Sequence, residues 1–493
     1  MPTQHSSNIG PSGPLCPRLR HILTGTFNSN FLHLLRFDSL TKSLTLLLSV
    51  PALGPHQYLA ALPGDAGKGE RIVYATTWAE QSSISAWRVT GLLGNGGMAS
   101  GEPKVELINS RPIISAGSYL SVREQQAASS TSRAFLYQAG GPTGEVFALD
   151  TPSGAIGDRV QDLIFVKDMP DEGPQEGQRG SVAAERIRRD SSVDKTRKGL
   201  RYGAHSVEFD DVHSLAYVAH LGRNSILVYS VDPRSGQLTL QSEAHSPEAG
   251  DGPRHAVASR DGKWVFAVTE HTSYVDAYRL SPATTTSTPT LRHAQRLTIL
   301  PPTAEAHSYR GDTIRLSPSG RYLVATTRGG KPEVKGWVRA WKLRQSSDDG
   351  DGEVAKGQGP PLDDSWSWAC QTPTSGGKAN AWEWAAKQPQ PQKLNAAARE
   401  DGQEKDKNDD DDDLAVLTDD ERGYVSVMRF SPSRERSAGI REVARAQLPG
   451  GKVDDEDRGG SCDLVEPSAQ IPLSAHNGVT SEYEGASHAI WLD

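Results

Sequence analysis

The stretch HSVEFDDVHSLAYVAHLGRNSILVYSV, residues 205–231, contains three runs rich in β-branched and aromatic residues, separated by short polar turns. The same plan returns in RHAVASRDGKWVFAVTEHTSYVDAYRL, residues 254–280, and in DTIRLSPSGRYLVATTRGGKPEVKGWVRAWKL, residues 312–343. Each copy has a strand, a turn of the D/S-x-G type, an aromatic-rich strand, a short loop and a strand that ends in an aromatic region. The starts of the copies lie 49 residues (205 to 254) and 58 residues (254 to 312) apart.

Similar runs continue on both sides of these copies, and no convincing amphipathic helix interrupts them. A β-propeller blade has three or four strands in about 40 to 50 residues, and it cannot bury both of its faces alone. Residues 21–493, once insertions are discounted, provide about seven such units. The sequence therefore predicts an all-β fold, a seven-bladed β-propeller in a single domain. We expect HILTGTF (21–27) to pair with strands near the terminal AIWLD (489–493), which leaves no free edge between the first and last blades.

Low-complexity segments interrupt the repeats. They are charged or glycine-rich and lack an apolar period, so we expect disordered insertions of little functional weight near 170–199, 345–360, 388–413 and 452–484. The third ends in five consecutive aspartates, and the alternative interpretation of that run as a calcium site lacks spaced ligands and a turn glycine. Residues 1–20 have no apolar segment typical of a secretory signal, and we expect a disordered N-terminal tail there.

The composition limits the setting and the partners of the protein. Hydrophobic residues make up 36% of the 493, which is enough for a core. The net charge of −8 and the pI near 6.0 provide no broad positive field for nucleic acid. No run approaches the ~20 apolar residues of a membrane helix, and Cys16, Cys370 and Cys462 are too far apart for a disulfide framework or a zinc ribbon. We expect a soluble, cytoplasmic protein without nucleic-acid or membrane partners; the sequence leaves open whether it forms a homo-oligomer.

The common catalytic and cofactor motifs are absent from the sequence. It contains no G-x-S-x-G, no G-x-x-x-x-G-K-[ST], no strand-linked G-x-G-x-x-G and no H-E-x-x-H. Any catalysis is therefore expected to depend on histidine, arginine and carboxylate side chains, with no cofactor and no metal.

Equivalent positions of the repeats carry such side chains. His205 opens one copy and Arg254 the next, while Glu270 and Arg328 follow the second strands of adjacent copies. The first strands of propeller blades line a central channel and the loops at one end form its mouth, so these residues can converge although they are distant in sequence. Each has a structural alternative: a buried structural histidine, a turn cap or partner of Asp251, a surface ion pair, and a solvated loop arginine.

Two blocks, AHSVEFDDVHSLAYVAHLGRNSILVYSVDPRSGQL (204–238) and GDGPRHAVASRDGKWVFAVTEH (250–271), resemble the seven-bladed propeller family that joins bacterial 6-phosphogluconolactonases to fungal carboxy-cis,cis-muconate cyclases. The fungal cyclases are the more similar branch. Four further segments match that branch in order and spacing: YRGDTIRLSPSGRYLVATTR (309–328), QTPTSGGKANA (371–381), LTDDERGYVSVMRF (417–430) and HAIWLD (488–493). The resemblance covers about residues 21–493.

The resemblance implies a metal-independent intramolecular lyase, a cycloisomerase of the protocatechuate branch of the β-ketoadipate pathway. Such an enzyme lactonises the tricarboxylate 3-carboxy-cis,cis-muconate to a carboxymuconolactone by adding a carboxylate across a double bond. The family's catalytic histidine and glutamate map onto His205 and Glu270, and its substrate-binding arginines onto Arg254 and Arg328. The guanidinium groups would hold the substrate and stabilise the enolate-like charge that forms. We assign the proton to His205 and an orienting or relay role to Glu270, although the sequence alone does not decide which is the acid.

Two other functions are alternatives to this assignment. A lactone hydrolase of the 6-phosphogluconolactonase type would bind phosphate with the same arginines and activate water with His205 or Glu270. A catalytically silent propeller would be a protein-binding platform, and the four residues would then diverge.

Some residues depart from the family pattern or favour a structural role. His220, in AHLGRN, stands where the family has aspartate, which alters the pocket rim or only a loop. The segment after Tyr137 is shorter than in the cyclases, and the insertions near 170–199 and 388–413 could cover the mouth. Arg310 and Asp312, in YRGD, are interpreted as a local salt bridge.

Overall fold

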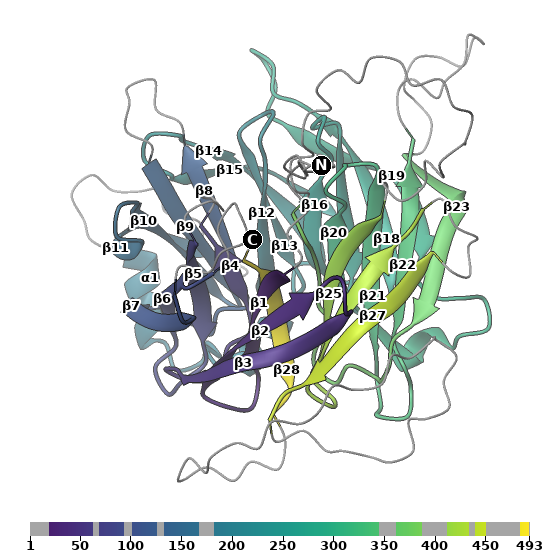
Figure 1. The fold of residues 1–493 in the computed structure, drawn as a ribbon. Helices are drawn as coiled ribbons and strands as arrows, with labels where there is room; N and C mark the ends of the chain where they lie inside the picture. Colours follow the sequence, from purple (N-terminus) through teal and green to yellow (C-terminus); the bar gives the residue numbers. More distant parts are fainter. Residues whose placement is uncertain are drawn as a thin grey trace, which may run out of the picture.

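The computed structural model describes nine parts of the chain, which are residues 19–62, 69–92, 101–125, 133–166, 182–344, 361–386, 412–432, 439–449 and 484–492. Within these ranges the strands form seven antiparallel sheets of four strands each, arranged around one axis (Figure 1). The prediction of an all-β, seven-bladed β-propeller is therefore confirmed.

Every blade has four strands, which follow one another from the axis to the outer rim. Blade 1 has β28 (Ala486–Trp491), β1 (Leu19–Thr26), β2 (Phe31–Asp38) and β3 (Ser43–Pro51), and blade 2 has β4 (Leu59–Ala61), β5 (Glu70–Thr77), β6 (Ser83–Thr90) and β7 (Lys104–Pro112). Blade 3 has β8 (Tyr119–Gln125), β9 (Arg133–Gly140), β10 (Thr143–Asp150) and β11 (Ala155–Ile164), and blade 4 has β12 (Ala204–Asp210), β13 (Leu215–His220), β14 (Ser225–Val231) and β15 (Leu238–His245). Blade 5 has β16 (Pro253–Ala258), β17 (Trp264–Thr269), β18 (Tyr274–Ser281) and β19 (Thr290–Thr298), and blade 6 has β20 (Tyr309–Leu316), β21 (Tyr322–Gly329), β22 (Trp337–Leu343) and β23 (Leu362–Gln371). Blade 7 has β24 (Trp382–Trp384), β25 (Asp413–Asp419), β26 (Tyr424–Phe430) and β27 (Ile440–Gln447).

The ring is closed by the two ends of the described chain. Strand β28 is the innermost strand of blade 1 and pairs antiparallel with β1, with Ile22 opposite Trp491 and Leu23 opposite Ile490. In Figure 1 the yellow β28 lies beside the purple β1. The innermost strands of neighbouring blades contact one another all the way round. The predicted closure is therefore confirmed, and it leaves no open sheet edge between the first and last blades.

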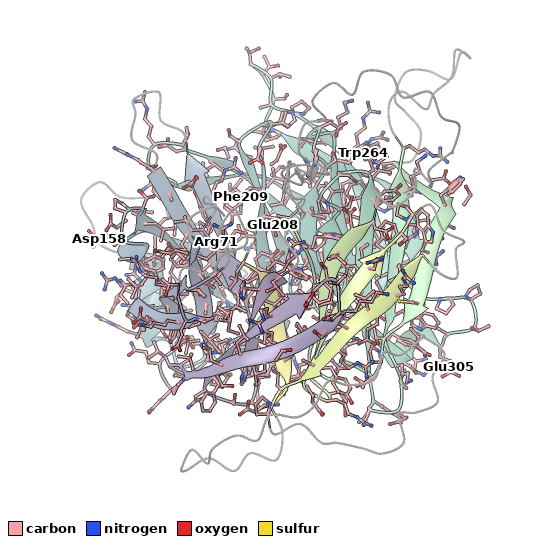
Figure 2. The ribbon with its side chains drawn as sticks, viewed as in Figure 1. Arg71, Asp158, Glu208, Phe209, Trp264 and Glu305 are labelled. Carbon is pink, nitrogen blue, oxygen red and sulfur yellow. The ribbon has the colours of Figure 1, made fainter. Side chains whose placement is uncertain are left out.

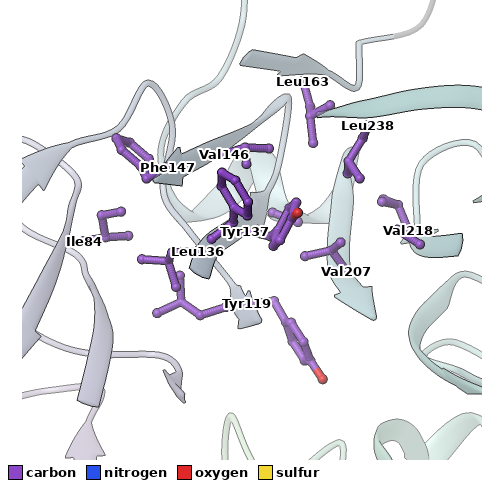
Figure 3. Packing of buried hydrophobic residues seen from close by; sticks show 14 of the residues in the cluster. Ile84, Tyr119, Leu136, Tyr137, Val146, Phe147, Leu163, Val207, Val218 and Leu238 are labelled. Carbon is purple, nitrogen blue, oxygen red and sulfur yellow. The ribbon is translucent and has the colours of Figure 1, made fainter. Parts of the chain in front are cut away.

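The core lies between blades, because the faces of each sheet pack on those of its neighbours. The second strand of blade 4, LAYVAH, is buried along its whole length, as expected for a strand covered on both faces. Figure 3 shows one such interface, where Tyr137 and Val146 of blade 3 pack near Val207 and Val218 of blade 4. Burial of aromatic and branched side chains in these layers supplies the main stabilisation of the fold.

One expectation about the insertions, the disorder of the segment 170–199, is wrong in part. Between β11 and β12 the chain forms an α-helix, α1 (Val182–Arg189), and a 3₁₀ helix, η2 (Arg197–Arg201). Ala184 and Ile187 of α1 are buried in a cluster with Ile114 and Ile164. The end of the segment 170–199 is thus packed rather than disordered. The helix α1 is too short to show an apolar period in the sequence, and its contacts with blade 3 stabilise it.

Other boundaries shift by small amounts. Strand β1 begins at Leu19, inside the predicted tail, and β25 begins at Asp413, the last residue of the predicted insertion near 388–413. The insertion near 345–360 and nearly all of the one near 452–484 lie outside the described residues. In the described part of the chain, no helix has the length and apolar character required to cross a membrane.

Buried threonines tie neighbouring blades together next to the axis. The hydroxyl of Thr326, in β21, accepts the amide of Thr313 at 3.1 Å and donates to the carbonyl of Asn380 in the next blade at 2.7 Å. Thr418 makes the same pair of bonds one blade further on, to Ala381 and Ser487.

Thr326→Val is expected to destabilise the protein by about 1–3 kcal/mol, because it leaves a buried amide and a buried carbonyl without partners. Thr326→Ser keeps the hydroxyl and is the matched control. Urea unfolding of both variants measures the difference, and equal stabilities would contradict the role given to this hydroxyl.

Candidate active site

The innermost strands of blades 4, 5 and 6 are irregular at corresponding positions. In blade 4 the pairing passes from Ala204 to Ser206, while the partner strand advances by one residue, so His205 is the extra residue of a β-bulge. In blade 5 Arg254 is the extra residue in the same way. The pairing of blade 6 also shifts by one residue, between Gly311 and Ile314. A β-bulge changes the direction in which a side chain points, and bulges are common beside active sites. Gly252, with φ of +66°, provides the turn that leads into the bulge of blade 5.

Arg254 is the centre of a buried ion cluster. Its Nε lies 3.2 Å from Oε2 of Glu270, and its Nη2 lies 3.1 Å from Oδ1 of Asp312. Its Nη1 donates to the main-chain carbonyl of Asp312 at 2.7 Å. The Arg254 side chain is only 6% exposed, and its buried charge is compensated by these carboxylates and hydrogen bonds.

Two further arginines surround the same glutamate. Arg328 donates from Nη2 to Oε1 of Glu270 at 3.1 Å and from Nη1 to the carbonyl of Lys378 at 2.9 Å. Arg310 approaches Oε1 of Glu270 at 3.5 Å, and its side chain is 52% exposed. Three arginines therefore meet the carboxylates of Glu270 and Asp312, and the cluster has an excess of one positive charge if each group is ionised.

His205 lies at the edge of this cluster. Its ring centre is 5.3 Å from that of His255, whose Nε2 is 3.1 Å from Nη1 of Arg254. Its own carbonyl accepts the Ser118 hydroxyl at 2.8 Å, which fixes the bulge. Nδ1 of His205 is buried and has no hydrogen-bond partner among the described residues.

The charges of the cluster set the protonation states. Burial alone would raise the pKa of Glu270, but the charges of Arg328 and Arg254 outweigh it and lower that pKa to about 2. Burial, assisted by the positive charge of Arg254, lowers the pKa of His205 well below its usual 6.5. At neutral pH the site thus presents an ionised glutamate and a neutral imidazole.

Aromatic rings fill the axis further along the inner strands. The ring of Tyr119 in blade 3 lies 5.0 Å from that of His255 in blade 5, which is possible only across the axis. Tyr58 stacks on Tyr119 at 4.0 Å and on His488 at 3.9 Å. His255 thus contacts both this ring cluster, which we call the aromatic floor (Tyr58, Tyr119 and His488), and Arg254 of the ion cluster.

A second buried polar group lies beyond this floor. Arg315 donates to Glu383 at 2.8 Å and to the hydroxyl of Tyr58, and the hydroxyl of Tyr119 donates to Glu208. Figure 2 shows Glu208 near the centre of the ring of blades and Asp158 and Glu305 toward its rim.

The structure brings together all four residues that the sequence singled out. His205, Arg254, Glu270 and Arg328 come from blades 4, 5 and 6 and converge at one end of the axis, whereas the binding-platform alternative predicted that they diverge. Their roles in catalysis stay predictions. The interpretation of Arg310 and Asp312 as a pair is wrong, because they bind Glu270 and Arg254 respectively.

The sequence had given Asp312 no functional role, although its place at the start of a repeat matches those of His205 and Arg254. His220 is the last residue of β13, and its side chain holds the loop that follows: it accepts the amide of Arg223 at 3.0 Å and contacts the carbonyl of Phe165 at 2.8 Å. Among the described residues, no group of three or more histidine, cysteine, aspartate or glutamate side chains is arranged to hold a metal ion.

Comparisons with known proteins agree with this architecture. The family model described as "Lactonase, 7-bladed beta-propeller" matches residues 21–345. Muconate cycloisomerase 1 of Cutaneotrichosporon cutaneum is 31% identical over 369 residues, which are 74% of this chain and 84% of that protein. Carboxy-cis,cis-muconate cyclase of Neurospora crassa is 26% identical over 253 residues, which are 50% of this chain and 57% of that protein. The periplasmic gluconolactonase of Pseudomonas aeruginosa has the same fold, with a TM-score of 0.54 and 15% identity over 86% of this chain and 99% of that one.

Proposed function

The chain belongs to the lactonase family of seven-bladed β-propellers, and on that premise we propose that it is a cytoplasmic cycloisomerase that lactonises 3-carboxy-cis,cis-muconate. Its distant relatives include fungal enzymes named muconate cycloisomerase and carboxy-cis,cis-muconate cyclase. The observation that carries the proposal is the convergence of Arg254, Arg328 and Arg310 beside a buried imidazole.

The arginines support binding of a small polyanion. A tricarboxylate brings three negative charges, and the guanidinium fork matches a carboxylate in geometry and charge. Arg310 has most of its donors free, since its contact within the described residues is the one with Glu270. Arg254 and Arg328 are held in place by Glu270 and Asp312, so they are oriented before the substrate arrives.

The proposed reaction consumes one C=C bond and forms one C–O and one C–H bond. A substrate carboxylate oxygen attacks an alkene carbon, and the electron pair moves to the carbon next to another carboxylate. Arg254 and Arg328 stabilise that enolate-like charge, and His205 gives the carbon its proton. With a pKa near 2, Glu270 is almost never protonated at neutral pH, which favours an orienting role for it.

The proposed proton donor leads to a specific pH dependence. An acid must be protonated, so kcat/KM should fall as pH rises through the lowered pKa of His205 in the free enzyme, below 6.5. The charges of the bound tricarboxylate raise the pKa of His205, so the fall in kcat should lie at a higher pH. Separate pH profiles of kcat and kcat/KM measure the two falls. If kcat and kcat/KM fell at the same pH, the assignment of His205 as the proton donor would be contradicted.

Substrate assays test the proposed function. Purified protein with 3-carboxy-cis,cis-muconate should remove the ultraviolet absorbance of the conjugated diene, with and without a chelator. The rival activity is hydrolysis of 6-phosphogluconolactone, since 6-phosphogluconolactonase of Pectobacterium carotovorum is 28% identical over 127 residues. Hydrolysis of that lactone together with an unchanged muconate spectrum would overturn the proposal.

A further inference from the structure

Arg197 reaches the site from a segment outside the repeats. It begins η2, between blades 3 and 4, in a turn anchored to blade 3 by a bond from the Ala116 amide to the Lys195 carbonyl at 2.9 Å. Its guanidinium carbon lies 4.1 Å from the ring centre of Trp78 and 5.8 Å from that of Phe27. Those rings belong to blades 2 and 1, so this side chain extends over the same end of the axis.

The two rings occupy the positions that Glu270 and Arg328 occupy elsewhere. Trp78 follows β5, and its amide donates to the Pro55 carbonyl before the innermost strand, as that of Glu270 donates to the Gly252 carbonyl, both at 2.7 Å. Phe27 follows the second strand of blade 1. Residues at the ends of the second strands, or directly after them, therefore form one ring around the mouth, with ionic side chains in blades 5 and 6 and aromatic ones in blades 1 and 2.

The guanidinium of Arg197 is held in place by aromatic rings, and its donors have no partner among the described residues. In the described part of the chain no hydrogen bond or ion pair joins it to another residue, and the rings position it through cation–π contacts. Trp78 is itself fixed, since its indole N–H donates to the Gly117 carbonyl at 2.8 Å. The carboxylate whose charge acts on Arg197 is that of Asp420, which Lys378 approaches at 3.6 Å. Asp420 thus pairs with Lys378 and not with Arg197, whose donors have no partner within the described residues.

We propose that Arg197 binds the substrate carboxylate that lies farthest from Arg254 and Arg328, and that it selects 3-carboxymuconate over muconate, which lacks the third carboxylate. This inference rests on the proposed function. The rings that position Arg197 belong to blades 1 and 2, whereas the ion cluster belongs to blades 5 and 6, so an anion bound by Arg197 would lie across the mouth from the ion cluster. An uncharged group in that place would leave Arg197 without an anionic partner.

The test compares Arg197→Met with wild type on two substrates. For 3-carboxy-cis,cis-muconate, kcat/KM should fall by about 10- to 100-fold, as expected when a hydrogen-bonded charge pair is lost. For cis,cis-muconate it should stay unchanged. Arg197→Lys keeps the charge but lacks the planar fork, so its kcat/KM for 3-carboxy-cis,cis-muconate should lie between those of wild type and Arg197→Met. Arg201→Met, from the exposed end of η2, makes the same change in net charge and should leave both values unchanged.

The outcomes separate this inference from the proposed function. Equal losses on both substrates, or no loss on either, would overturn the role of Arg197 while the cyclase activity stands. If wild type turns over neither substrate, the proposed function fails, and calorimetric titration with the two muconates decides the inference. The inference would be supported if wild type binds the tricarboxylate more tightly than the dicarboxylate and Arg197→Met loses this preference. It would be overturned if wild type and Arg197→Met bind the tricarboxylate equally.

Discussion

His205→Gln is expected to lower kcat on 3-carboxy-cis,cis-muconate by about 10²- to 10⁴-fold, the usual contribution of a positioned proton donor. Glutamine keeps a polar side chain of similar reach but has no acidic proton to transfer. KM should change little, because the binding charge is on the arginines. The His205 ring makes no hydrogen bond through Nδ1 among the described residues, so the fold should lose little stability. Steady-state kinetics and a thermal unfolding midpoint measure the two effects.

His293→Gln is the matched control for that variant. His293 lies on the outermost strand of blade 5 and contacts Asp276 at 3.0 Å, away from the axis. Its turnover should equal that of wild type. Normal turnover by His205→Gln would rule out His205 as the donor.

Arg254→Lys is expected to lower kcat/KM by about 10²- to 10³-fold, the loss found when one donor to a developing charge is removed. A lysine ammonium cannot span Glu270, Asp312 and the substrate at once, because it lacks the planar fork of arginine. Lysine keeps the positive charge, so Glu270 and Asp312 are not left without a cation. The loss of stability should therefore be smaller than the about 3–5 kcal/mol that breaking a buried ion pair costs.

Arg339→Lys controls for the chemistry of the substitution. Arg339 lies on the third strand of blade 6, pairs with Asp364 at 3.1 Å, and has a side chain that is 16% exposed. Its replacement should leave kcat/KM unchanged. Equal kcat/KM values for Arg254→Lys and Arg339→Lys would show that Arg254 does not act on the substrate.

The site was predictable from the sequence wherever the repeats extend. Repeats that fold alike and close into a ring place equivalent residues at equivalent heights, so the alignment of His205 with Arg254, and of Glu270 with Arg328, became proximity in space. Asp312 held an equivalent place, but its charge has an obvious local partner in Arg310, and the sequence could not show that the bulge turns it toward Arg254 instead.

Arg197 could not be found in this way. It belongs to the segment between blades 3 and 4, which has no counterpart in the other blades, and its polar composition predicted disorder. The helix α1 depends on burial of Ala184 and Ile187 against blade 3, a tertiary effect that leaves almost no local pattern. The position of Arg197 over Trp78 depends on how that segment returns to the axis, which only the folded chain defines.

The central claim is that three blades hold one small polyanion between their arginines and His205. A crystal structure of the His205→Gln variant with 3-carboxy-cis,cis-muconate tests it most directly. We predict carboxylates within hydrogen-bond distance of Arg254, Arg328 and Arg310, and an alkene carbon facing residue 205. A ligand bound elsewhere, with the ion cluster unchanged, would contradict it.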